Sequence, residues 1–346
     1  CHIRSSCLCT TRKANWLTGR SVTESEGLVV ADLSRFNLRD IFGNWWDKAS
    51  PIQRGIFRVL LIALFYALPL LNNPIIDTPE TSFQSVLFYP LIMFSLMAVG
   101  LNVVVGKSGI LDLGYVAFFA IGAYTHAMLG IKTGLNFYEI LPIAMGMAML
   151  AGVILGLPAL RLRGDYLAII TLGFGEIVRI IAINTEAIGG SAGLTDIPPP
   201  PSILGLKFGS GDPRPYYWLT LTLVILVIWG VLRLSHRKPG RAWEAIRQDE
   251  DVAEFMGVST LKYKLWAFII GGAVGGAAGA VYASQILSIQ PEMFNLNLSI
   301  MILACVVFGG MGNIWGVIVG AVLLGYLPEK LRFLSDYRIV FFGLLM

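Results

Sequence analysis

Charged residues are scarce in this chain of 346 residues, since Asp, Glu, Lys and Arg make up 14%. Soluble domains carry about 25% charged residues. Hydrophobic residues make up 55%, and the mean hydropathy is +0.70. This balance excludes an ordinary soluble domain and predicts an all-α polytopic membrane protein, in which the 38 glycines let helices pack closely. The net charge of +4 is no nucleic-acid signal, because the basic residues lie beside apolar segments and set orientation.

Residues for catalysis and metal binding are also few. Cys305 lies in an apolar run, where a thiol behaves as a small hydrophobe. His126 stands alone in an expected span, which favours a packed or hydrogen-bonded side chain over a ligand. The other cysteines and a histidine lie in the polar tail without the paired spacing of a zinc site: Cys1, Cys7, Cys9 and His2. No catalytic motif such as H-E-x-x-H or G-x-S-x-G occurs, so we expect no enzyme, metal site or cofactor.

An ATP site is missing as well. Residues 100–108 read GLNVVVGKS, which approaches a phosphate-binding loop. Five residues separate the two glycines, whereas that loop requires four, and no strand precedes it. If ATP drives this protein, a separate subunit must hydrolyse it.

Apolar runs dominate the chain, and a span needs about 20 residues. We expect about ten transmembrane or re-entrant helices, at 56–72, 84–105, 110–130, 139–160, 165–184, 217–234, 263–284, 298–309, 313–327 and from 338 onward. The run at 298–309 is too short to cross alone. It meets the next run at Gly309-Gly310-Met311-Gly312, where we expect the chain to reverse within the protein.

The basic residues predict the orientation. Residues 233–264 hold seven of them, so we place the loop 235–262 and the N-terminus in the cytoplasm. The loop 185–216 holds only two basic residues, and we expect it outside. Residues 1–50 read as a partly disordered or interfacial cytoplasmic tail, and 51–346 as the transmembrane domain. Because the chain begins with Cys and ends at Met346 in an apolar run, we expect one or both ends to be incomplete.

Charges within expected spans are costly and therefore informative. Glu176 and Arg179 lie three residues apart, so on a helix they share a face and can pair. The pair either faces an amino-acid substrate or forms a structural ion pair near the bundle interior, and we favour the structural role. Lys107 and Asp112 flank a glycine-rich turn, where we expect their side chains to reach the interface.

Two glycine-rich turns share a spacing. Gly106 and Gly109 follow one apolar run, and Gly309, Gly310 and Gly312 follow another. Transporters are often built from repeats. So few matching positions in a Gly- and Val-rich sequence favour chance over a repeat, so we predict only two helix-connecting turns.

Several longer stretches carry a family resemblance. They are Gly109–Tyr124, Leu160–Arg179, Gly240–Arg247, Val306–Gly316 and Leu327–Glu329. In this order, from about Leu91 onward, they resemble the LivM-type permease subunit of branched-chain amino-acid ABC importers. The resemblance implies an ABC-importer permease fold in a prokaryotic cell membrane.

The resemblance also implies partners. A LivM-type subunit works with a second, LivH-like permease, two cytoplasmic ATPase subunits and an extracytoplasmic substrate-binding protein. The E-A-A-x-x-x-G loop, which couples such permeases to the ATPase, matches Asp251, Val252, Ala253 and Gly257. Asp251 replaces Glu and Val252 replaces the first Ala of that motif, and Gly257 suits a turn that a Cβ would obstruct.

Other functions stay open at this point. A urea or short-amide ABC permease shares the expected fold, although the stretch from Arg163 to Glu176 looks more like the amino-acid branch. A channel or secondary transporter would explain the hydropathy but would not need a coupling loop. The substrate itself is not readable, because in such importers the binding protein selects it.

Overall fold

The computed structural model describes residues 51–70, 82–159, 162, 164–202, 208–209 and 212–330. The predicted tail 1–50 and the predicted segment from 338 onward lie outside these residues. The chain divides into two units, 1–65 and 66–346. Within the first, the described part is helical and belongs to α3. Within the second, the described segments contain helices and isolated bridges but no strand.

The described helices follow the apolar runs closely. In chain order they are α3 (Pro51–Ala67), α4 (Phe83–Val86), α5 (Met93–Leu101), α6 (Val116–Thr133), α7 (Phe137–Ala159), α8 (Asp165–Asn184), α9 (Arg214–Ser235), α10 (Lys238–Gln248), α11 (Glu250–Phe255), α12 (Thr260–Ile286), α13 (Leu296–Gly309) and α14 (Ile314–Lys330). Two π-helical segments, η2 (Leu87–Ile92) and η3 (Asn102–Lys107), continue α4 and α5 into one long helical segment, which is kinked at Tyr89. The 3₁₀ turn η6 (Pro291–Met293) precedes α13.

Six helical segments among the described residues are long and apolar enough to cross a membrane. They are Phe83–Lys107, Phe137–Ala159, Tyr166–Asn184, Arg214–Ser235, Thr260–Ile286 and Pro291–Gly309. This number is smaller than the ten predicted segments. The run predicted at 110–130 becomes helical only at Val116, because Gly109 adopts a φ of +73° and the Gly114 amide bonds to the Asp112 side chain in a turn.

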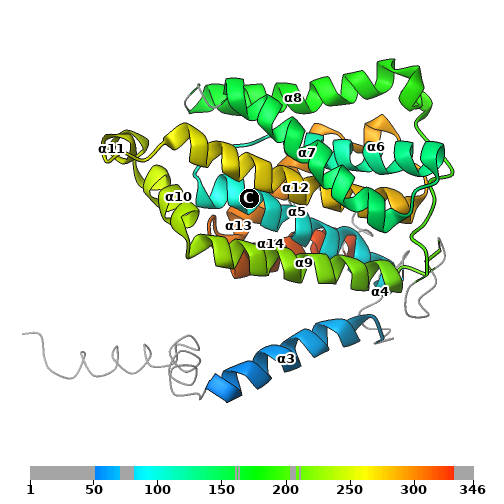
Figure 1. The fold of residues 1–346 in the computed structure, drawn as a ribbon. Helices are drawn as coiled ribbons and strands as arrows, with labels where there is room; N and C mark the ends of the chain where they lie inside the picture. Colours follow the sequence, from blue (N-terminus) through cyan, green and yellow to red (C-terminus); the bar gives the residue numbers. More distant parts are fainter. Residues whose placement is uncertain are drawn as a thin grey trace, which may run out of the picture. The chain divides into compact units, whose positions relative to one another are not determined.

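The core forms around α12, which packs on α5, α6 and α7 (Figure 1). A Cβ added to Gly122 of α6 would lie 2.1 Å from the Gly276 carbonyl oxygen of α12. One added to Gly279 would lie 2.0 Å from the Phe119 oxygen. The helix backbones therefore touch where side chains are absent, which is the packing that the glycine content predicts.

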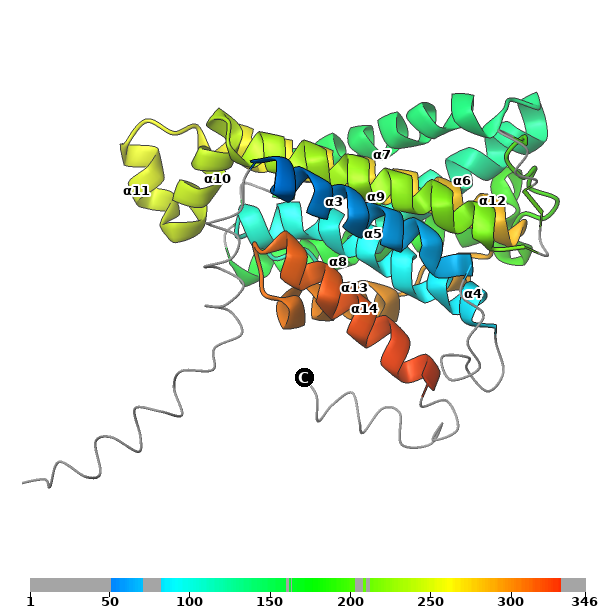
Figure 2. The ribbon, with the colours of Figure 1, turned by 90° about the horizontal axis from the view of Figure 1, so that it is seen from below.

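The chain reverses between α13 and α14, as predicted for the glycine-rich turn. Gly310 and Gly312 have φ angles of +90° and +88°, and the two helices pack along each other (Figure 2). A Cβ on Gly309 would lie 2.4 Å from the Gly316 oxygen, so the hairpin closes tightly. At its start, Asn295 caps α13 and η6 extends the apolar segment to 19 residues, which is longer than the predicted run 298–309.

Two opposite ends of the second unit carry the connecting segments. Helices α10 and α11 lie together at one end, where α12 begins (Figures 1 and 2). The described parts of the loop 185–216 lie at the other end, where α12 ends and Leu194 bridges to Ile289. The two loops thus lie at opposite ends of this unit, and their assignment to the two sides of the membrane stays a prediction.

Candidate functional site

Helix α11 is short but well terminated at both ends. The Asp249 carboxylate accepts a hydrogen bond of 3.0 Å from the Val252 amide, which caps the N-terminus. At the other end, the Gly257 amide donates to the Glu254 oxygen and the Val258 amide to the Ala253 oxygen. These bonds, with Gly257 at a φ of +84°, form a Schellman motif. The predicted coupling residues therefore lie on a defined helix and turn.

Helix α11 and the residue after it expose three apolar side chains, beside the exposed Asp251 and Glu254. Phe255 is 89% exposed, Met256 80% and Val252 55%, whereas Ala253 is buried against the protein. Beside these residues lies a hollow of about 300 Å³, lined by Lys238, Arg241, Ala242, Gly257, Val258, Ser259 and Tyr263. Large apolar side chains exposed together are typical of a surface that contacts a protein partner or a membrane. We call Val252, Phe255 and Met256 the α11 surface.

Two contacts hold α10 and α11 against the start of α12. The Lys264 ammonium, which is buried on α12, lies 2.5 Å from a Glu250 carboxylate oxygen of α11. The indole nitrogen of the buried Trp243 on α10 donates to the Tyr263 oxygen at 2.7 Å. Both contacts join α10 and α11 to α12, the central helix of the core.

The predicted glycine turns meet beside α10. Arg247 near the end of α10 donates a hydrogen bond of 2.7 Å to the Gly106 oxygen. The Asn102 side chain of η3 accepts one of 2.8 Å from the Gly312 amide. Gly109 packs against the Arg247 stem, while Gly309 and Gly310 lie in the α13–α14 hairpin. The sequence predicted both turns but not their contact.

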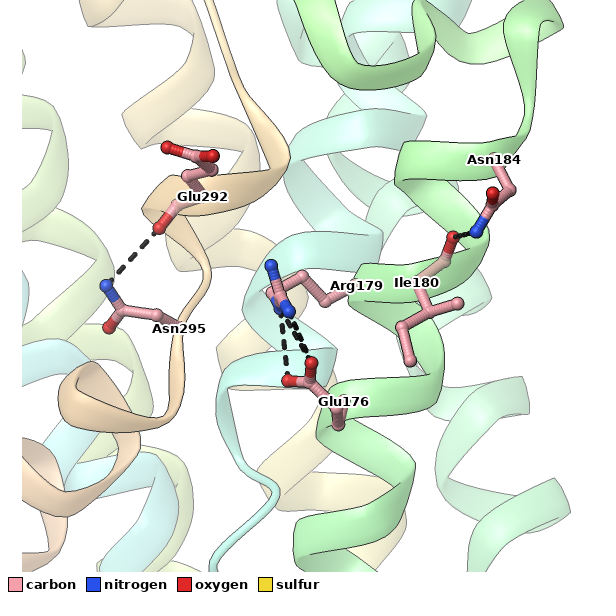
Figure 3. Close-up of polar contacts among 6 residues, drawn as sticks. All are labelled: Glu176, Arg179, Ile180, Asn184, Glu292 and Asn295. Carbon is pink, nitrogen blue, oxygen red and sulfur yellow. Dashed lines mark hydrogen bonds and ion pairs between the residues drawn. The ribbon is translucent and has the colours of Figure 1, made fainter.

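The predicted pair on α8 also forms. The Arg179 Nε atom lies 3.1 and 3.0 Å from the two Glu176 oxygens, and Nη2 makes a further contact. The Arg179 side chain extends from α8 toward the turn that carries Glu292 and Asn295 (Figure 3). Its side chain is 27% exposed and that of Glu176 is 42% exposed. The pair thus lies at the surface of this subunit rather than within its bundle.

Comparison with known proteins decides the family. Residues 85–346 match the sequence profile described as branched-chain amino acid transport system / permease component. The chain belongs to this family. The permease is 40% identical over 319 residues to the high-affinity branched-chain amino acid transport system permease protein LivM of Escherichia coli, which covers 86% of this chain and 73% of that protein.

More distant relatives are permeases too. The probable branched-chain amino acid transport permease protein LivM of Methanocaldococcus jannaschii is 30% identical over 187 residues, 52% of this chain and 53% of that protein. The ribose import permease protein RbsC of Haemophilus influenzae is 26% identical over 250 residues, 70% and 74% of the two chains. No solved structure matches. Family and apolar helices together make this chain a multi-pass membrane permease, and its relatives are described as transport proteins rather than enzymes.

The expectation for the Asp112 side chain was wrong. Asp112 does not reach the interface, because its side chain is fully buried and its Oδ1 accepts the Gly114 amide at 2.8 Å. Burial raises the pKa of this carboxyl to about 6. His126 is packed as expected, buried edge-on against the Phe137 ring. Within the described residues no group of His, Cys, Asp and Glu could hold a metal ion.

The residues that connect the helices and turns of the permease were not predicted from the sequence. Arg247 was visible as the last residue of the stretch Gly240–Arg247, and Asn102 as a lone amide in an apolar run. Their partners lie 141 and 210 residues away in sequence, so no local spacing could reveal them. Lys264 could have been noticed, because a lysine at the start of an apolar helix needs an acidic partner if it is buried.

Proposed function

We propose that this chain is the transmembrane permease subunit of an ABC importer for branched-chain or related hydrophobic amino acids, with ATP hydrolysed by separate cytoplasmic subunits. The identity of 40% to E. coli LivM over most of both chains supports the importer class and the substrate class together. The α11 surface is the proposed contact with an ATPase subunit. Its side chains are apolar. The helix that carries them is capped at both ends and connected to the core, as a coupling element requires.

We place the permease in a prokaryotic cell membrane with the N-terminus and the loop 235–262 in the cytoplasm. The basic residues gather at the end that carries α10 and α11, where Lys238 and Arg241 line the hollow. Positive charge is retained on the cytoplasmic side. The substrate-binding protein then delivers its ligand at the opposite end, near the segments 185–202 and 287–295.

The α8 pair supports the proposed second permease. Glu176 lies eight residues before the end of α8 at Asn184, about 12 Å along the helix. The hydrocarbon core is about 30 Å thick, so this carboxylate sits near its middle. Half-exposed charges at that depth are costly against lipid. We infer that a second, LivH-like permease covers this face and that the pair has a structural role there.

Two alternatives are less well supported. A urea or short-amide permease would share the fold, and the likeness to a ribose permease shows that relatives carry different substrates. A channel or secondary transporter would not need an exposed, doubly capped α11. The family membership of residues 85–346 favours an importer over a channel or a secondary transporter.

Uptake by the reconstituted importer tests the function. The chain is co-expressed with its proposed partner permease and ATPase subunits, inserted in proteoliposomes and supplied with the proposed binding protein. We expect uptake of radiolabelled leucine that requires ATP and the binding protein. Uptake without the ATPase subunits would indicate a channel or secondary transporter, and uptake of urea in place of leucine would overturn the substrate class.

A further inference from the structure

Arg247 lies where three segments meet. It is the penultimate residue of α10, and its side chain leaves that helix toward two glycine turns. Its Nη1 atom donates to the Gly106 oxygen at 2.7 Å, at the end of the long helix that contains α5. A guanidinium carries several donors in one rigid plane, so it can bond one backbone segment while packing on another.

The second segment is the turn between α13 and α14. A Cβ on Gly312 would lie 2.4 Å from the same Nη1 atom and 3.0 Å from the Gly106 oxygen. A Cβ on Gly109 would lie 3.1 Å from the Arg247 Cγ atom. Gly109 and Gly312 also have φ angles of +73° and +88°, which disfavour other residues. Both turns therefore leave room for this one side chain.

The two turns also touch each other directly. A Cβ on Gly106 would lie 2.4 Å from the Gly312 nitrogen and 1.8 Å from the Asn102 Oδ1 atom, which already accepts the Gly312 amide. Asn102 is buried, so this bond is shielded from water. Arg247 thus contacts a unit that joins α5 and α6 on one side and α13 and α14 on the other.

Two other polar contacts hold α10 and α11 on α12, while the Trp243 ring also shares a buried apolar cluster with Val99 and Val103 of the long helix. Trp243 and Glu250 both contact the start of α12, at Tyr263 and Lys264. The Arg247 bond connects α10 to the paired turns by a different route. We propose that Arg247 is a positioning residue that transmits movement of α10 and α11 to the two glycine turns, so that the ends of α5, α6, α13 and α14 move together during transport. This inference rests on the proposed ATP-driven function.

The test compares variants in the complete reconstituted importer. Arg247→Met keeps the aliphatic stem but removes every donor, and Arg247→Lys keeps a charge without the planar donor group. Arg237→Gln removes a charge from the other end of α10 and serves as the control. The readouts are ATPase co-purification, ATP hydrolysis and leucine taken up per ATP hydrolysed.

We expect Arg247→Met to bind the ATPase and hydrolyse ATP, while uptake per ATP falls about tenfold, as loss of one charge-assisted hydrogen bond predicts. Arg247→Lys should lie between Met and wild type, and Arg237→Gln should match wild type. Wild-type uptake per ATP in Arg247→Met overturns the inference. If Arg247→Met does not assemble with the ATPase, Arg247→Lys serves as the test. Wild-type uptake per ATP in Arg247→Lys would also overturn the inference. Absence of ATP-dependent uptake in the wild-type importer would instead refute the proposed function.

Discussion

At the scale of single residues, Gly257 shows how a structure refines a motif. We expected a Cβ at this position to obstruct the turn. No atom lies within 4 Å of where that Cβ would be, so the subunit leaves space for it. The requirement for glycine comes instead from the φ of +84°, a conformation that costs other residues about 1–2 kcal/mol.

This difference yields a graded prediction. Gly257→Ala should destabilise the end of α11 and lower the amount of ATPase that co-purifies, whereas Gly257→Asn, which tolerates a positive φ, should bind nearly as wild type. Gly257→Trp should in addition project into the proposed contact and release the ATPase. Gly146→Ala, in open space on α7, is the control. Equal binding by all variants would mean that α11 is only a connector.

Asp112 leads to a prediction about pH. Its folded pKa of about 6 lies above its ordinary value of 3.8. Well below pH 3.8 the carboxyl is protonated in both folded and unfolded chains, so burial costs nothing through ionisation. As the pH rises toward 6, the unfolded chain loses this proton first, and the folded state loses up to about 3 kcal/mol of stability.

Asp112→Asn should remove this pH dependence, because Asn keeps an oxygen that accepts the Gly114 amide. We expect a higher melting temperature than wild type at pH 7.5 in detergent and a smaller difference at pH 4.5. Glu186→Gln, which changes an exposed carboxylate, should behave as wild type. The same pH profile in Asp112→Asn and wild type would contradict the assignment.

At the scale of elements, helix α8 carries an ion pair, and the rest of the described protein covers only a small part of its surface. It packs mainly through residues such as Ala168 and Thr171, and Ile169, Ile177 and Ile181 are exposed. The three-residue spacing was enough to predict that Glu176 and Arg179 pair, because helix geometry fixes which side chains are neighbours. Their position relative to the rest of the bundle depends on which face α8 turns outward, and the apolar residues on every side of the pair do not reveal it.

The structural role of the pair predicts non-additive mutations. Glu176→Gln leaves Arg179 without its partner within the membrane and should lower the yield of folded permease, at a cost of about 1–3 kcal/mol. Glu176→Gln combined with Arg179→Gln should partly restore the yield, measured by size-exclusion chromatography in mild detergent. A single variant that folds normally but abolishes uptake would place the pair in the substrate path.

At the scale of the whole molecule, the order and extent of most helices were predictable. Each long apolar run satisfies its own backbone and needs no knowledge of its neighbours. The turn before α6 was missed because a side chain, Asp112, replaces a helical hydrogen bond there. The contact of Arg247 with the two glycine turns was not predicted, because it depends on how three segments that are distant in sequence pack together.

The sidedness of the two ends can be tested directly. In a background without Cys1, Cys7, Cys9 and Cys305, we expect an impermeant thiol reagent to label Ser202→Cys in intact cells but not Glu244→Cys. Both side chains are exposed, so access depends on sidedness alone. Permeabilised cells should show labelling of both. Labelling of Glu244→Cys alone in intact cells would invert the topology.

The two caps of α11 have a consequence for how importers diversify. Asp249 and Val258 begin and end a segment that carries its own start and stop signals, so both ends of its helix are set within the segment itself. Such a segment is exchangeable. Grafting the corresponding ten residues of a ribose permease in place of residues 249–258 should redirect the choice of ATPase while leaving the transported solute unchanged. The choice of ATPase and the choice of transported solute can then evolve separately within one permease.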